Sequence, residues 1–98
     1  MKNWKQYNID LGTVKQGTKH IMEFVSNSTL VVNKFSPGCS HCTSIKGYEN
    51  NILKVGYNAE YLPVHLKKQG FQNIRKVITV VYEDGRKEIL SFTAKIVE

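Results

Sequence analysis

The sequence has 98 residues, 41% of them hydrophobic, and its 14 basic and 8 acidic side chains give a formal net charge of +6. This length predicts a single domain over residues 1–98, and the composition argues against a disordered chain. No apolar run reaches the roughly 18 residues that span a bilayer, and the residues after Met1 lead into no apolar signal-peptide core. We therefore expect a protein with no membrane partner and no export signal.

Short segments with alternating apolar and polar side chains follow one another along the first half of the chain. We expect strands at 7–11, 20–25 and 30–35, a loop bracketed by glycines at 12–17, and a short apolar segment at 52–55. Residues 43–55 are the stretch most compatible with a helix, but Gly47 and two asparagines make them a poor one.

The second half predicts three further strands. The first, at 59–66, contains Pro63, which cannot donate a ladder hydrogen bond, so we expect an edge strand or a bulge there. The other two, at 74–82 and 88–97, flank Asp84-Gly85, the strongest hairpin signal of the chain. About seven evenly spaced strands predict an all-β, immunoglobulin-like sandwich of antiparallel strands. Its core is expected over about 7–97, with a short N-terminal segment, 1–6, outside it.

The order of these motifs resembles a small bacterial immunoglobulin-like domain family of unassigned function, abundant in Bacteroidetes and related to the Hydin- and ASPM-type domains. The most specific part is the opening stretch, Asp10-Leu11-Gly12-Thr13-Val14-Lys15-Gln16-Gly17. The resemblance implies the fold and brings no catalytic residue with it. Members usually carry Cys-Gly-Cys-Thr, whereas Ser40 and His41 separate the two cysteines here.

The pair Cys39 and Cys42 admits three interpretations. A thioredoxin-like redox motif has this spacing but needs a long helix after the second cysteine. A metal site has weak candidate ligands in Cys39, His41 and Cys42, with His20 or His65 as a fourth, but only one of the usual two knuckles is present. We favour a pair of reduced, partly buried thiols that fill space at one end of the sandwich. We expect no catalytic residues and no cofactor.

Aromatic side chains are the best candidates for contacts with another protein, because tyrosine and tryptophan are frequent interface anchors. The candidate interface residues are Trp4, Tyr48, Tyr57, Tyr61 and, on the expected edge strand, Pro63. Trp4 precedes the first strand, where we do not expect a small core to reach it. The alternative is that Trp4 covers one end of its own sandwich.

These observations predict a non-enzymatic structural module. We favour an accessory or decoration protein of a phage virion that binds capsid proteins, located in the virion if phage-encoded and otherwise in the cytoplasm. A thiol or metal module at Cys39 and Cys42 is the first alternative. A nucleic-acid-binding domain ranks last, because only Arg75 and Arg86 are arginines and no aromatic and basic platform is present. The scattered lysines are interpreted as a solvated surface that helps docking onto an acidic protein assembly.

Overall fold

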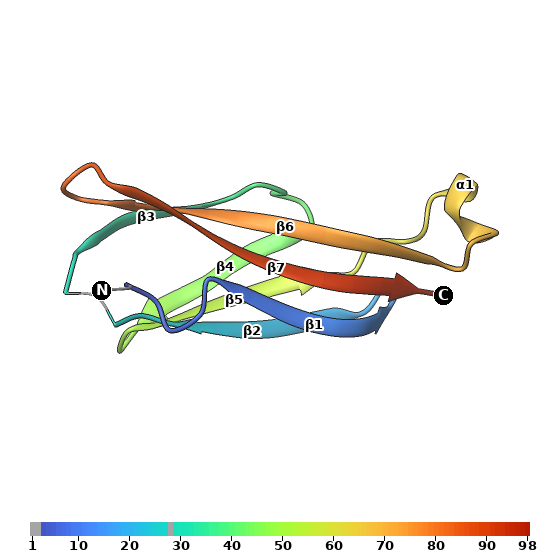
Figure 1. Cartoon of the computed structure of the whole chain (residues 1–98), viewed down its shortest axis with the longest axis horizontal. Helices are drawn as coiled ribbons and strands as arrows, with labels where there is room; N and C mark the ends of the chain where they lie inside the picture. The colour runs from blue at the N-terminus through green and yellow to red at the C-terminus, as the bar shows by residue number, and fades with distance from the viewer. Residues whose placement is uncertain (1–2, 28) are drawn as a thin grey trace.

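The computed structural model describes residues 3–27 and 29–98. Within these residues it has seven strands and one short helix. The elements in chain order are β1 (Asn8–Lys15), β2 (Lys19–Val25), β3 (Val32–Pro37), β4 (Thr43–Glu49), β5 (Ile52–Asn58), α1 (Val64–Lys67), β6 (Phe71–Tyr82) and β7 (Lys87–Val97). The molecule is elongated, with extents of 47 × 21 × 19 Å (Figure 1). No helix of this described part is long and apolar enough to cross a membrane.

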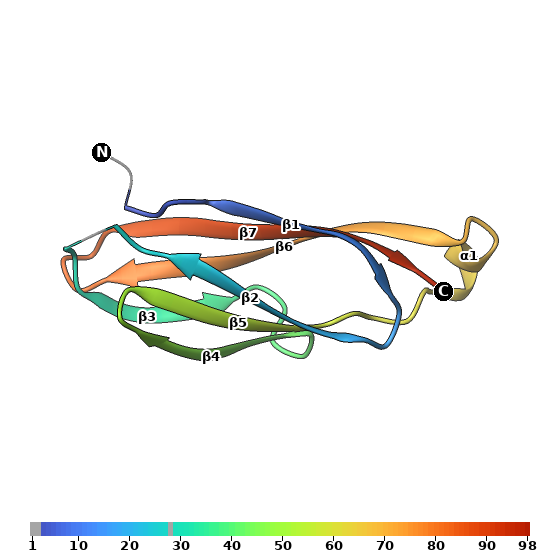
Figure 2. The same ribbon diagram turned by 90° about the horizontal axis from the view of Figure 1, so that it is seen from below.

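The strands form two sheets that pack face to face (Figures 1 and 2). One sheet has the order β1-β7-β6-β3 and the other the order β2-β5-β4. The predicted all-β sandwich is therefore confirmed, and so is the hairpin at Asp84-Gly85, which joins the two longest strands, β6 and β7.

The expectation of uniformly antiparallel strands is wrong for one pair, since β1 runs parallel to β7. The next strand in the sequence, β2, belongs to the other sheet. Within its own sheet β1 therefore pairs with the last strand, β7. β1 also continues beyond the predicted 7–11 into the expected loop. Gly12 takes a positive φ of 73°, and its N–H donates to the Asp10 carboxylate at 2.8 Å. The register between β1 and β7 shifts here, so the strand passes through a bulge without ending.

Two other segments also differ from expectation. Residues 59–66 form no edge strand, because Pro63 precedes the first turn of α1, a position where the missing N–H of proline costs nothing. The most helix-compatible stretch, 43–55, is instead the hairpin of β4 and β5. Asn50 and Asn51, both with positive φ, form its turn, a conformation that asparagine tolerates well.

The core lies between the sheets and is formed by the side chains that alternate inward. β7 contributes Leu90, Phe92, Ala94 and Ile96, while β6 contributes Ile74, Ile78, Val80 and Tyr82. Most polar side chains of the two strands lie at the intervening positions, among them Asn73, Arg75, Thr79, Thr93 and Lys95.

The core also includes Trp4, whose side chain is 0% exposed. The expectation that the N-terminal segment, 1–6, lies outside the core is therefore wrong for Trp4, while residues 1 and 2 of that segment lie outside the described residues. The Lys5 N–H donates to the Val25 carbonyl at 2.9 Å, and the Asn27 N–H donates to the Asn3 carbonyl at 2.7 Å. These bonds hold the segment beside the end of β2 and turn the indole ring into the interior.

Candidate functional site

The two cysteines are joined in a disulfide, so the expectation of reduced thiols is wrong. The connection that holds them leads from β3 in one sheet to β4 in the other. At its start the Gly38 N–H donates to the Val77 carbonyl of β6, and at its end the Asn58 N–H of β5 donates to the Cys42 carbonyl, both at 2.8 Å. The disulfide thus closes a tight turn that is fixed to both sheets.

The histidines do not join the cysteines in a metal site. His41 is exposed within the disulfide turn, and His65 is exposed on α1. His20 is half-buried on β2, where its Nε2 lies 2.7 Å from the Thr18 hydroxyl. The described residues contain no group of three or more His, Cys, Asp or Glu side chains that could hold a metal ion. After Cys42 the chain enters β4 at Thr43, and not the long helix that a thioredoxin-like motif needs.

Reduction of the Cys39–Cys42 disulfide should lower the free energy of unfolding by about 2 kcal/mol, because the cross-link closes only a short loop and removes little entropy from the unfolded chain. Urea unfolding of the wild type with and without dithiothreitol measures this difference. The double variant Cys39→Ala/Cys42→Ala is the control, and its unfolding midpoint should not respond to the reductant. An unchanged wild-type midpoint after verified reduction would contradict the stabilising role.

The predicted interface aromatics separate into interior and surface residues. Trp4 and Tyr57 are 0% and 1% exposed, so neither can anchor a partner. Tyr48 is half-buried and packs against the rings of Trp4 and Phe35. Tyr61 is exposed and Pro63 is half-buried, and both belong to the segment between β5 and α1.

This segment lies at one end of the elongated molecule, together with the β1–β2 turn and the last residues of β7 (Figure 1). We call residues 15–19, 59–71 and 95–98 the α1 end. Backbone hydrogen bonds at 2.8 Å run from the Gly17 N–H to the Ala59 carbonyl and from the Ala59 N–H to the Thr18 carbonyl. The Leu62 N–H donates to the Gln16 side-chain carbonyl at 3.0 Å. These hydrogen bonds hold residues 59–62 against the β1–β2 turn.

Two large apolar side chains of this part of the chain, Tyr61 and Val64, point into solvent. Tyr61 is 73% exposed and Val64 is 83% exposed, the highest values among the exposed large hydrophobic residues. The Tyr61 ring lies against Gly17, where an added Cβ would come within 2.7 Å of the Tyr61 hydroxyl oxygen. Gly17 also has a positive φ of 75°. Tyr61 was predicted from the sequence, but Val64 was missed because it had been assigned to a strand.

A partly exposed ion pair links the same segment to β6. Glu60 accepts from Lys76 of β6 at 3.0 Å, which links the segment to the inner face of the four-stranded sheet. Tyr57 lies nearby in the core, and its burial together with the Glu60 charge raises its pKa to about 12. The phenol therefore stays neutral through the physiological range and acts as a packing residue against Phe92.

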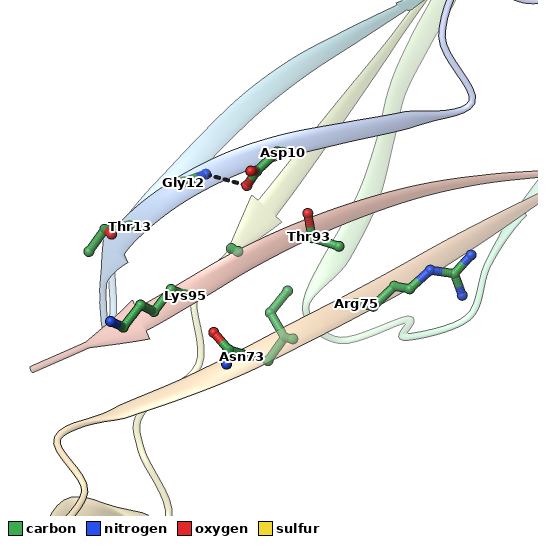
Figure 3. Close-up of a pocket in the computed structure, with 9 residues that line it drawn as sticks. Asp10, Gly12, Thr13, Asn73, Arg75, Thr93 and Lys95 are labelled. Carbon is green, nitrogen blue, oxygen red and sulfur yellow. Dashed lines mark hydrogen bonds between the residues drawn. The ribbon is translucent and has the colours of Figure 1, made fainter.

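A shallow hollow of about 540 Å³ adjoins the α1 end on the outer face of the four-stranded sheet (Figure 3). Its polar lining comes from two neighbouring rows of the sheet, Asp10–Thr93–Arg75 and Thr13–Lys95–Asn73. The bulge at Gly12 forms its border on β1. Figure 3 shows Arg75 and Lys95 extending in opposite directions along the sheet, while Asp10 is turned toward the Gly12 N–H.

A second cluster of titratable groups ties the N-terminal segment to the opposite end of the molecule. Glu88 accepts hydrogen bonds from the hydroxyls of Tyr82 and Tyr7 and from the Asn3 amide, while the Trp4 indole N–H donates to Tyr82 at 2.9 Å. Burial alone would raise the pKa of Glu88, but these three hydrogen bonds outweigh it, so the pKa is lowered. Burial, followed by the bond to Glu88, raises the pKa values of Tyr7 and Tyr82. Each polar group has a partner, which indicates a structural role.

No family model matches this sequence, and neither does any curated protein. The choice of site therefore depends on geometry. The two most exposed large apolar side chains, Tyr61 and Val64, lie three residues apart on a hydrogen-bonded frame, next to a hollow lined by charged and polar groups. These features make the α1 end the candidate functional site.

Proposed function

We propose that this chain is an immunoglobulin-like sandwich that acts as a non-enzymatic protein-docking module. The strand order supports the fold assignment. Lettered A to G in chain order, the strands form the sheets A-G-F-C and B-E-D. Constant-type immunoglobulin domains have C-F-G against A-B-E-D, so the difference lies in the first strand, which pairs with the last strand in place of the second.

The observation that carries the docking function is the exposure of Tyr61 and Val64 on a rigid frame. Ordering a flexible loop at an interface costs conformational entropy, and this reduces affinity. Here hydrogen bonds already hold the segment against the β1–β2 turn, and Gly17 seats the tyrosine ring. Tyrosine side chains in such positions are frequent hot spots of protein interfaces.

The larger setting we propose is a protein assembly, with the chain as an accessory or decoration protein of a phage virion that binds capsid proteins. An elongated body whose apolar anchors lie at one end suits a component that stands on the surface of a larger particle. In this proposal the chain is located in the virion, with the α1 end against the capsid and the opposite end directed outward.

Site-specific photo-crosslinking tests this function. The photoreactive amino acid p-benzoylphenylalanine replaces Tyr61 in one variant and Glu49 in a control variant. Glu49 is exposed at the end of β4 where it pairs with Ile52, away from the α1 end. Each variant is produced in host cells during phage growth, and the particles are purified and irradiated. We expect adducts between the Tyr61 variant and a capsid protein, identified by mass spectrometry, and few or none from the control.

Two outcomes would overturn the proposal. Absence of the chain from purified particles would exclude the virion setting. Equal adduct yields from positions 61 and 49 would exclude the α1 end as the docking surface, because the crosslinks would then reflect proximity without a specific contact.

A further inference from the structure

Positive charge is concentrated at the α1 end. Five lysines belong to it, against two acids, Glu60 and Glu98, so less than a quarter of the chain carries half of the formal net charge of +6. The lysines are Lys15, Lys19, Lys67, Lys68 and Lys95, and all five are exposed. Charge that looks scattered along the sequence is therefore gathered at one end by the fold.

The acids near this end do little to offset the lysines. Glu60 is engaged by Lys76 at 3.0 Å, so its charge is already balanced. Lys95 lies over the Phe71 ring, with its Nζ 4.5 Å from the ring centroid, and borders the hollow of Figure 3. Asp10 is the one acid among the residues that line the hollow. Its carboxylate accepts a hydrogen bond from the Gly12 N–H, which keeps it close to the backbone of β1.

The opposite end of the four-stranded sheet has a different charge balance. The β6–β7 hairpin there contains Arg86 and Lys87, but also Glu83 and Asp84. Arg86 pairs with Asp84 at 3.0 Å. The α1 end therefore has a net positive charge, whereas the charges of residues 83–87 cancel.

We infer that the surface which docks on the α1 end is an acidic protein surface, with carboxylates around an apolar seat for Tyr61 and Val64. This inference rests on the docking function proposed above. An apolar centre with a charged rim is the usual composition of a protein interface, and complementary charge speeds encounter and selects the partner. The Thr13, Thr93 and Asn73 side chains give the hollow neutral hydrogen-bond donors that a carboxylate of the partner can use.

Binding of a fluorescein-labelled glutamate 20-mer at low salt tests this inference by fluorescence anisotropy. The variant Lys67→Glu/Lys68→Glu should weaken binding about tenfold, which corresponds to about 1.4 kcal/mol. The matched control is Lys34→Glu/Lys87→Glu, which makes the same change in net charge. Lys34 and Lys87 pair with Val81 from either side in the four-stranded sheet, away from the α1 end. Their replacement should change the affinity less than about threefold.

Parallel titrations with a 20-base-pair DNA duplex and with phosphatidylglycerol vesicles separate the partner classes. Tighter binding of either probe, lost in the Lys67→Glu/Lys68→Glu variant, would overturn the inference in favour of that partner. Equal losses in both lysine variants would overturn it as well, because only net charge would then matter. Adducts from position 61 that persist with Lys67→Glu/Lys68→Glu would refute the acidic partner and leave the docking function intact.

Discussion

Replacement of Trp4 by alanine should lower the free energy of unfolding by about 3–5 kcal/mol, the usual cost of removing a large buried aromatic ring. The ring is 0% exposed, packs against Phe35 and Tyr48, and donates its N–H to the Tyr82 hydroxyl. The substitution would leave a cavity and a buried hydroxyl with one partner fewer. Urea unfolding followed by circular dichroism measures the change.

The matched control is Tyr61→Ala, which should change stability by less than about 0.5 kcal/mol because that ring is largely exposed. A domain of this size has a total stability of about 5–15 kcal/mol, so Trp4→Ala could prevent folding altogether. Trp4→Phe keeps much of the ring volume and gives a smaller, measurable loss. A Trp4→Ala variant as stable as Tyr61→Ala would refute the buried position of Trp4.

Replacement of Glu88 by alanine should lower the free energy of unfolding by about 2 kcal/mol at neutral pH. The carboxylate accepts hydrogen bonds from Tyr82, Tyr7 and Asn3, and the variant would leave these donors without their common acceptor. Equilibrium unfolding in urea at pH 7 is the measurement. Glu83→Ala is the control, since Glu83 is an exposed acid at the start of the same hairpin.

The contribution of Glu88 should also depend on pH in a defined direction. Its pKa in the folded protein lies below the ordinary value of 4.5, so the folded state holds this proton less tightly than the unfolded chain does. The stabilisation is then complete above pH 4.5 and is lost as the pH falls through the lowered pKa. The stability difference between wild type and Glu88→Ala should shrink from pH 7 to pH 3. A difference that stays constant would show that the charge of Glu88 is not what matters.

Strands β6 and β7 were predicted well because their sequence signals are local. In β7 apolar and polar side chains alternate from Leu90 to Ile96, and Asp84-Gly85 before it favours a tight hairpin. The segment around Pro63 was predicted wrongly for a related reason. Its alternating apolar residues resemble a strand, but they belong to a fastened segment and the first turn of a short helix.

The candidate site was only partly predictable. Of the candidate interface residues, Tyr61 is exposed and Pro63 is half-buried, whereas Trp4 and Tyr57 lie in the core. Alternation tells which side chains share a face of a strand, but it does not tell which face meets the other sheet. For Trp4 there is no strand to count along, so its burial depends on Asn27 and Val25, whose backbone groups hold the N-terminal segment in place.

The sequence by itself determined the class of fold, because strand periodicity and turn residues act over a few neighbouring positions. It also determined that the chain is basic and small, with the length of one domain. Only the tertiary structure decided that β1 pairs with β7, that Cys39 and Cys42 form a disulfide, and that five lysines lie at the same end of the molecule as Tyr61 and Val64. Each of these depends on which groups the folded chain brings close together. The alternation of apolar and polar residues along a strand does not determine that.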